Sequence, residues 1–183
     1  MLSKKVLVKS ITNLSEARYC AGMMVDFISF DFNPDSEAFV KKEHFEEIRN
    51  WLSGVKILGL FDSLDAAEVQ NLIEEKSLDG FIFQDFQEGL ISQVEADIKM
   101  FEIKLSEISD KSVSGVDNII VYSDQKIEKL PELHPNILVG YDFDNLDAFI
   151  NSEIGFAFYG SKELRPGFST YDELMDCLEK LDD

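Results

Sequence analysis

The sequence predicts a compact (β/α)8 TIM barrel in which the helices after the fifth and sixth strands are shortened to turns. Short apolar runs rich in Val, Ile, Leu and Phe recur at roughly even spacing, and several are separated by longer amphipathic segments. This alternation is typical of repeated strand–helix units and therefore of a parallel sheet. The chain has 183 residues, whereas such barrels usually need about 200 to 250. An open doubly wound sheet is therefore the structural alternative.

Four strand–helix units account for the first half of the chain. In the first unit, a strand over residues 5–9 leads to a helix over 14–24, and a side-chain oxygen of Thr12 or Asn13 can cap that helix. In the third unit, the helix places its apolar residues at the spacing of one helix face. The other units of this half are strand 26–30 with helix 41–52, strand 55–61 with helix 63–76, and strand 78–83 with helix 88–96.

The second half of the chain contains four further strands and less helix. Segments 106–116 and 125–135 leave little room for a helix, and Pro131 and Pro135 interrupt the second of them. A well-patterned helix over 170–181 closes the chain. No stretch rich in Pro, Gly or Ser divides the sequence, so we expect residues 1–183 to form one domain. The strands of this half are residues 98–105, 118–122, 136–140 and 155–159.

The charge balance and the cysteine count exclude several classes of partner. The formal net charge of −19 repels nucleic acids and anionic membranes. Cys20 and Cys177 lie far apart and cannot form a CxxC motif, which indicates reduced thiols in a cytoplasmic protein. His44 and His134 have no second ligand at metal-binding spacing, so we expect no metal and no cofactor. No apolar run approaches the ~18 residues that cross a bilayer.

Three stretches of the chain match a known family in order along the sequence. They are residues 8–13 (VKSITN) with 16–22 (EARYCAG), residues 26–36 (DFISFDFNPDS), and residues 155–163 (GFAFYGSKE) with 165–167 (RPG). These stretches resemble the first strand and helix, the second strand and its loop, and the eighth strand of phosphoribosylanthranilate isomerases, which act in tryptophan biosynthesis. The resemblance implies a (β/α)8 barrel that catalyses an Amadori rearrangement.

The positions at which that family transfers protons carry other residues here. The family reaction needs an acid that opens a furanose ring and a base that removes a proton beside the resulting Schiff base. Lys9 stands where the resemblance implies a cysteine base, and Tyr122 stands where it implies an aspartic acid. An ammonium has no lone pair, and a phenol is a weak acid. Asp124 could supply the acid if the sixth strand continues that far.

The loops that bind the substrate in that family differ as well. Where the family has an arginine that faces the anthranilate carboxylate, this chain has Glu37 or Ala38. The resemblance implies a phosphate site after strands seven and eight, where Gly140, Gly160 and Ser161 stand. The two glycines have an alternative explanation, because turns that need a positive φ also require glycine.

Two further carboxylates are candidates for ligand binding, because they fall near the carboxyl ends of strands, where barrel sites form. They are Asp31 and Asp85. The expected ligand is a small molecule such as a sugar phosphate. An inward-facing Lys9 could form a Schiff base, bind an anion, or pair with Asp31 or Asp124.

Three functions are consistent with the sequence. The first is a diverged isomerase-like barrel whose isomerase activity is weak or lost. The second is an enzyme that still isomerises phosphoribosylanthranilate through Asp124, or that performs another reaction through Lys9. The third is a non-catalytic barrel that binds a ligand or a partner. The sequence does not predict an oligomeric state.

Overall fold

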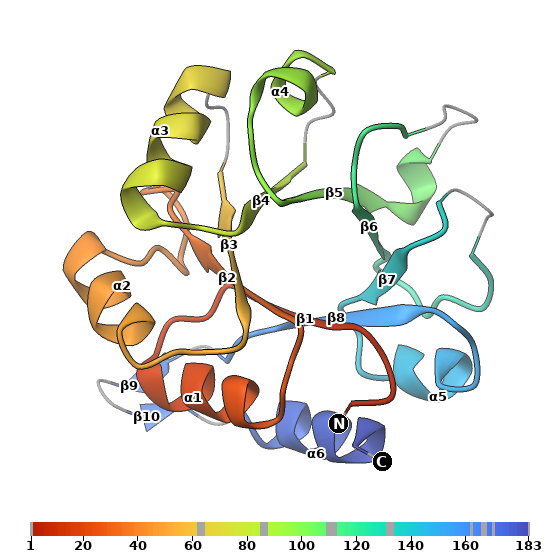
Figure 1. Ribbon diagram of the computed structural model, residues 1–183. Coiled ribbons are helices and arrows are strands. Elements are labelled where there is room, and N and C mark those ends of the chain that lie inside the picture. The colour runs from red at the N-terminus through yellow and green to blue at the C-terminus, as the bar shows by residue number, and fades with distance from the viewer. Residues whose placement is uncertain are drawn as a thin grey trace.

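The computed structural model describes residues 2–61, 65–84, 88–108, 113–130, 134–161, 163–165, 168–169 and 171–182. Eight parallel strands pair in chain order and close into a barrel, because β8 pairs with β1 (Figure 1). This closure confirms the predicted (β/α)8 barrel and excludes the open doubly wound sheet. The strands are β1 (Val6–Lys9), β2 (Phe27–Asp31), β3 (Lys56–Leu60), β4 (Gly80–Phe83), β5 (Ile98–Lys104), β6 (Asn118–Tyr122), β7 (Ile137–Gly140) and β8 (Gly155–Tyr159).

Helices surround the barrel, and Figure 1 shows them on its circumference. The described residues between β5 and β6 hold only the short 3-10 helix η1 (Leu105–Glu107), and those between β6 and β7 hold no helix, which agrees with the predicted shortening. A five-residue helix after β7 and a two-stranded hairpin after β8 were not predicted. The elements outside the barrel are α1 (Leu14–Gly22), α2 (Lys42–Arg49), α3 (Ala66–Lys76), α4 (Glu88–Gln93), α5 (Asn145–Phe149), β9 (Glu163–Arg165), β10 (Phe168–Ser169) and α6 (Asp172–Leu181).

Local side-chain hydrogen bonds begin two of these helices. The side chain of Asn13, one of the two predicted caps, accepts a hydrogen bond from the Glu16 amide at 2.9 Å. Asp65 and Glu68 form a reciprocal capping box at the start of α3. Each cap satisfies backbone amides that the helix itself leaves without partners. The caps therefore fix the points at which the chain turns back along the barrel.

Two apolar layers hold the barrel together. Buried side chains between the strands and the helices form the larger outer layer. An inner layer fills the barrel itself and consists of Leu7, Phe27, Leu58, Leu60, Ile82, Met100, Ile120, Leu138 and Ala157. Because both faces of the strands are covered, the strands are apolar at most positions, as is usual for parallel sheets.

Gly80 allows a close approach between β4 and β5. A Cβ atom on Gly80 would lie 1.9 Å from the Ile98 carbonyl oxygen, well inside van der Waals contact. Gly80 pairs with Ile98 in the register between β4 and β5. Only glycine therefore permits this pairing without a shift of the backbone.

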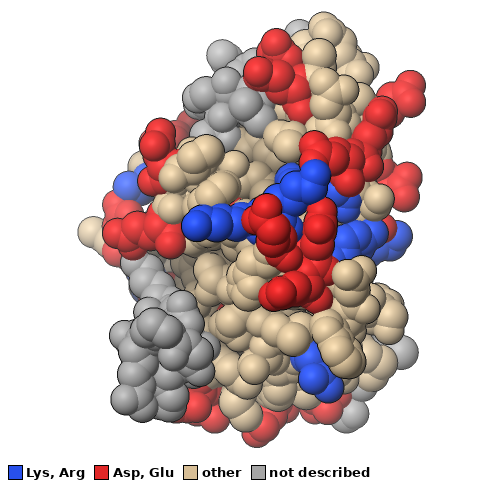
Figure 2. All heavy atoms as spheres, turned by 90° about the vertical axis from the view of Figure 1, so that its left-hand side faces the viewer, with Lys and Arg blue, Asp and Glu red and all other residues tan. Residues whose placement is uncertain are grey.

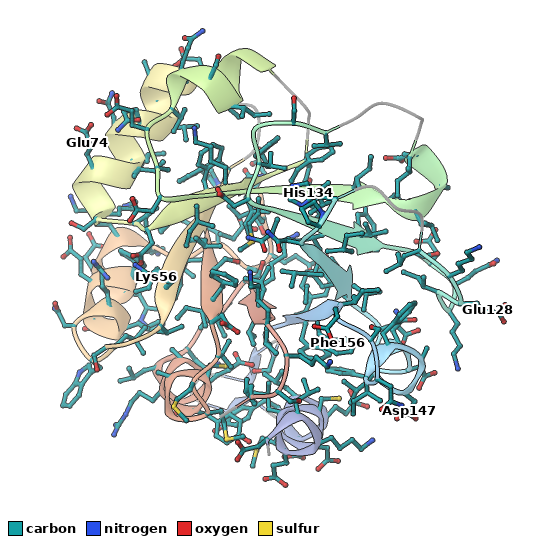
Figure 3. All side chains as sticks on the ribbon, turned by 45° about the vertical axis from the view of Figure 1, so that its right-hand side comes forward. Lys56, Glu74, Glu128, His134, Asp147 and Phe156 are labelled. Atoms are coloured by element: carbon teal, nitrogen blue, oxygen red, sulfur yellow. The ribbon has the colours of Figure 1, made fainter. Side chains whose placement is uncertain are left out.

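Charged side chains cover the outside of the molecule. Glu74, Glu128 and Asp147 lie at its periphery (Figure 3). On the face that carries α2 and α3, acidic and basic groups lie side by side (Figure 2). Ion pairs there join Lys42 to Glu75 at 2.6 Å and Lys56 to Asp79 at 2.7 Å. Within the described ranges, no helix is both long and apolar enough to span a membrane.

Candidate functional site

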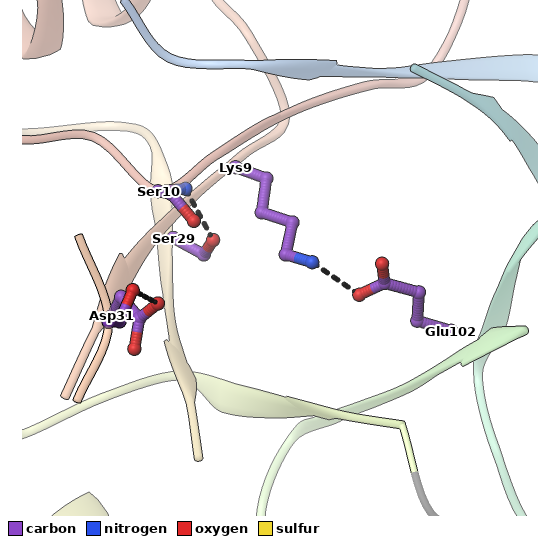
Figure 4. Close-up of polar contacts among 6 residues, drawn as sticks. Lys9, Ser10, Ser29, Asp31 and Glu102 are labelled. Atoms are coloured by element: carbon purple, nitrogen blue, oxygen red, sulfur yellow. Dashed lines mark hydrogen bonds and ion pairs between the residues drawn. The ribbon is translucent and has the colours of Figure 1, made fainter. Parts of the chain in front are cut away.

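A buried ion pair crosses the barrel at the carboxyl ends of the strands. Lys9 Nζ lies 2.5 Å from Glu102 Oε2, and the two side chains are only 3% and 1% exposed (Figure 4). Lys9 is the last residue of β1, and Glu102 lies within β5. In a barrel of eight strands, β1 and β5 stand on opposite sides of the axis. The long lysine side chain spans the interior that separates them.

Three tyrosines surround this ion pair. Lys9 Nζ lies 5.2 Å from the ring centroid of Tyr141 and 5.4 Å from that of Tyr159, distances at which an aromatic face attracts an ammonium. The rings of Tyr141 and Tyr159 are 4.1 Å apart, and Tyr122 lies 5.9 Å from Tyr141. At the carboxyl ends of the strands, the barrel therefore holds three aromatic rings close to one buried cation and one buried anion.

The same surroundings suppress ionisation of the phenols. Burial, followed by the Glu102 carboxylate, raises the pKa of Tyr159 to about 12 and the pKa of Tyr141 well above its usual value. The same two causes raise the pKa of Tyr122. At neutral pH all three hydroxyls keep their protons, and each is a weaker acid than an exposed tyrosine.

The partner of Lys9 differs from both predicted partners. Asp124 lies beyond the end of β6 with its side chain 75% exposed, and it forms an ion pair with Lys104. Asp31 instead accepts hydrogen bonds from the Asn33 amide at 2.9 Å and from the Ser36 hydroxyl at 2.5 Å. The prediction that Lys9 pairs with Asp31 or Asp124 was wrong, because strand closure brings Glu102 to the lysine.

A large cleft opens beside the ion pair. Its volume is about 1080 Å³, and its walls come from the ends of β1, β2, β3 and β8 and from the loop between β2 and α2. Lys9 and Asp31 reach it from the barrel, Glu37 and Ala38 reach it from the loop, and His44 reaches it from α2. The structure thus places a cleft at the face where sites form in barrels of this kind.

The backbone at the end of β1 is held in an unusual conformation beside this cleft. Ser10 has a φ of 60°, a left-handed conformation that residues other than glycine seldom adopt. Its amide donates a hydrogen bond to the Ser29 hydroxyl oxygen at 3.1 Å (Figure 4). The bond fixes the turn that follows Lys9 at the wall of the cleft.

Gly140 and Gly160 are not the positive-φ turn residues of the alternative explanation. Among described glycines, only Gly54 and Gly115 have a positive φ. Gly160 is explained by close packing instead, because a Cβ atom there would lie 3.0 Å from the Ser10 carbonyl oxygen and 3.2 Å from Glu16 Oε2. The Gly160 amide donates to the Lys9 carbonyl at 2.6 Å. Gly160 therefore lets the chain after β8 pack directly on the end of β1.

Glu16 anchors the chain that follows β8. This residue lies in the first turn of α1, is 0% exposed, and accepts a hydrogen bond from the Ser161 amide at 2.7 Å. Burial raises the pKa of its carboxyl to about 7. Ser161, predicted as a ligand residue, lies on the wall of the cleft and is positioned by this contact.

The remaining predicted residues are placed as follows. Asp85 lies outside the described residues. His44 binds the Thr12 carbonyl at 2.9 Å, and His134 contacts Asn136 within its own loop. In the part of the chain that the structure describes, no three His, Cys, Asp or Glu side chains gather as a metal site would require.

Sequence reasoning missed Glu102 and Glu16, although each left a signal. Glu102 is a lone carboxylate in an otherwise buried stretch of β5, and such a charge requires a partner. Glu16 stands three residues after the capping Asn13, a spacing that is typical of a helix start. In both cases the partner comes from a distant part of the sequence.

Comparison with known proteins gives similarity in structure only. Neither protein-family models nor curated protein sequences match the chain. Among solved structures, TrpF from Jonesia denitrificans superposes with a TM-score of 0.74 at 12% identity, covering 96% of this chain and 95% of that one. Phosphoribosyl anthranilate isomerase from Thermus thermophilus gives a TM-score of 0.72 at 17% identity, with 97% and 98% coverage.

A third similar structure was determined with a ligand. It is a phosphoribosyl anthranilate isomerase in complex with reduced 1-(o-carboxyphenylamino)-1-deoxyribulose 5-phosphate, with a TM-score of 0.70, 16% identity, and coverage of 96% of this chain and 97% of that one. These neighbours agree with the resemblance noted in the sequence. The chain has the fold of the phosphoribosylanthranilate isomerases.

Proposed function

We propose that this protein is a diverged relative of the phosphoribosylanthranilate isomerases that binds a small molecule in the cleft but isomerises phosphoribosylanthranilate weakly or not at all. The proposal rests chiefly on the buried contact between Lys9 and Glu102. Lys9 occupies the position that the resemblance assigns to the base. There its Nζ is held by a carboxylate at 2.5 Å and flanked by two aromatic faces, so this amine is not available to remove a proton from a substrate.

The protein also lacks a good proton donor for the step that opens the furanose ring. Burial and Glu102 make the Tyr122 phenol a weaker proton donor than an ordinary tyrosine. Asp124, the alternative acid, is largely in water and is bound to Lys104. The chain therefore supports neither half of the proton transfer.

The cleft nevertheless suits a hydroxylated ligand. Asp31, Ser36 and His44 present hydrogen-bonding groups along its walls, and the isomerase neighbour described above holds a sugar-phosphate compound. Glu37 and Ala38 stand where a carboxylate would need a cation, so the anthranilate group lacks a clamp. We propose a sugar phosphate as the ligand class and the cytoplasm as the location, the latter supported by two free, buried cysteines.

The decisive experiment measures consumption of phosphoribosylanthranilate by its fluorescence. We expect the purified protein to show a rate indistinguishable from buffer and to fail to rescue a tryptophan auxotroph. Turnover that is lost in Asp124→Asn but kept in Asp147→Asn, an exposed control on α5, would instead establish a working isomerase. Turnover that both variants retain would also overturn the proposal.

Ligand binding and Lys9 chemistry are tested separately. Thermal shift with ribose 5-phosphate, ribose and inorganic phosphate measures whether the cleft recognises the sugar, because a bound ligand stabilises the folded state. Borohydride treatment with small aldehydes tests Schiff-base formation at Lys9. We expect no labelling, because a lysine that is 3% exposed and held by Glu102 is not accessible to the aldehyde.

A further inference from the structure

A second cavity lies beside the cleft, between the ends of β7 and β8 and the start of α6. Its volume is about 380 Å³. Four aromatic rings contribute to its walls, and two carboxylates at the start of α6 complete them. These lining residues are Tyr141, Phe143, Tyr159, Tyr171, Asp172 and Glu173. None of the described lining residues carries a positive charge.

We propose that this cavity binds the ammonium group of a small organic amine or quaternary ammonium compound. Aromatic faces and carboxylates are the two groups that proteins use to hold such cations. The cavity shares Tyr159, Gly160 and Ser161 with the cleft. The inference does not depend on proton transfer, so it stands whether or not isomerase activity is found.

The molecule already shows that these rings accept an ammonium. Tyr141 and Tyr159 line the second cavity, and both also contact the Lys9 ammonium, at 5.2 and 5.4 Å from their centroids. Tyr159 is 49% exposed, so a large part of its ring remains open to a ligand. The ring pair therefore contacts the Lys9 ammonium and also contributes to the wall of the second cavity.

The electrostatic balance at α6 favours a cation over a phosphate. A helix N-terminus carries the equivalent of about half a positive charge, which by itself attracts anions. Asp172 and Glu173 in the first turn add two full negative charges that line the same cavity. The carboxylates outweigh the helix dipole, so an anion is repelled where an ammonium is attracted.

The test uses tetramethylammonium and choline as probes, titrated into the full-length protein by calorimetry at low salt. We expect saturable binding of choline with a dissociation constant below roughly 10 mM. The neutral analogue of choline, in which a tert-butyl group replaces the trimethylammonium, should bind at least about threefold more weakly, because it lacks the charge that the rings attract. Inorganic phosphate should show no binding that depends on Asp172 and Glu173.

Two pairs of variants locate the site. Asp172→Asn with Glu173→Gln should weaken choline binding by about three- to tenfold. Asp176→Asn with Glu179→Gln makes the same change in charge on exposed residues of α6 outside the cavity and should leave binding unchanged. Tyr171→Phe keeps a ring face and should bind like the wild type, whereas Tyr171→Leu should bind more weakly. Circular dichroism confirms that each variant is folded.

Several results would overturn the proposal. They are the absence of saturable ammonium binding, equal affinity for the neutral analogue, and equal effects of the two α6 charge pairs. Phosphate binding that is tighter than choline binding and that Asp172→Asn with Glu173→Gln strengthens would show that the cavity is an anion site instead. Because the isomerase assay does not enter this test, the two proposals can fail independently.

Discussion

At the scale of single residues, the contact between Lys9 and Glu102 dominates the barrel interior. Removing two charges from water costs several kcal/mol for each ion, and the pair recovers this only through close contact. The 2.5 Å separation and the two tyrosine faces supply that compensation for Lys9. The pair therefore restricts which substitutions the interior tolerates.

We predict that breaking this pair is far more costly than removing it. Glu102→Gln should lower the free energy of unfolding by about 3 to 5 kcal/mol, because Lys9 is left buried without its carboxylate partner. The double variant Lys9→Met with Glu102→Leu should recover most of that loss, because no buried charge remains. Urea denaturation of the singles and the double measures both effects.

An exposed ion pair provides the matched control. Lys42 and Glu75 lie 2.6 Å apart with side chains 55% and 49% exposed. Lys42→Met should leave the free energy of unfolding nearly unchanged, as is usual for ion pairs in water. A double variant at Lys9 and Glu102 that is as unstable as Glu102→Gln would contradict our account of the interior.

At the scale of secondary structure elements, Glu16 joins α1 to the chain after β8. Its carboxyl has a pKa of about 7 in the folded protein, against 4.5 for an ordinary glutamate. Below about pH 4.5 the carboxyl is protonated in both the folded and the unfolded protein. Its burial then carries no penalty for removing a charge from water. As the pH rises toward 7, the unfolded chain releases this proton while the folded protein retains it. The contribution of Glu16 to stability therefore falls over that range.

We predict that Glu16→Gln removes this dependence on pH. The variant can still accept the Ser161 amide, but it carries no charge at any pH. Its free energy of unfolding should match the wild type near pH 4.5 and exceed it at pH 7.5 by up to about 3 kcal/mol. Urea denaturation at a series of pH values gives the difference, which would be constant with pH if Glu16 were not desolvated.

The pairing of β4 with β5 leads to a second prediction at this scale. Gly80→Ala should lower the free energy of unfolding by at least about 2 kcal/mol, because the new Cβ atom would overlap the Ile98 carbonyl and force the strands apart. Gly22→Ala is the control, since no atom lies within 4 Å of a Cβ atom there. Amide hydrogen exchange should quicken in β4 and β5 of the first variant only.

Element positions were largely predictable, and their ends were less so. Apolar runs located all eight barrel strands, because a parallel sheet covered on both faces must be apolar at most positions. The third helix was predicted from residue 63 but begins at Ala66, after the Asp65 cap. The short α5 escaped prediction because five residues give too little periodicity to recognise.

At the scale of the whole molecule, we propose that the chain is one cooperative domain. Far-ultraviolet circular dichroism and the fluorescence of Trp51, the single tryptophan, should then give the same unfolding midpoint in urea. Trp51 follows α2 and packs against Arg18 of α1, so it reports on the first two units of the barrel. Two separated midpoints would show that parts of the chain unfold independently.

The sequence by itself determined the order of strands and helices, the barrel class and the acidic surface, because hydrophobic periodicity and composition are local properties. It also located Lys9 at the end of a strand. Only the tertiary structure decided that Glu102, 93 positions away, holds this lysine, and that Glu16 binds the chain after β8. Barrel closure sets these partners, and no local pattern encodes which side chains meet across a closed interior.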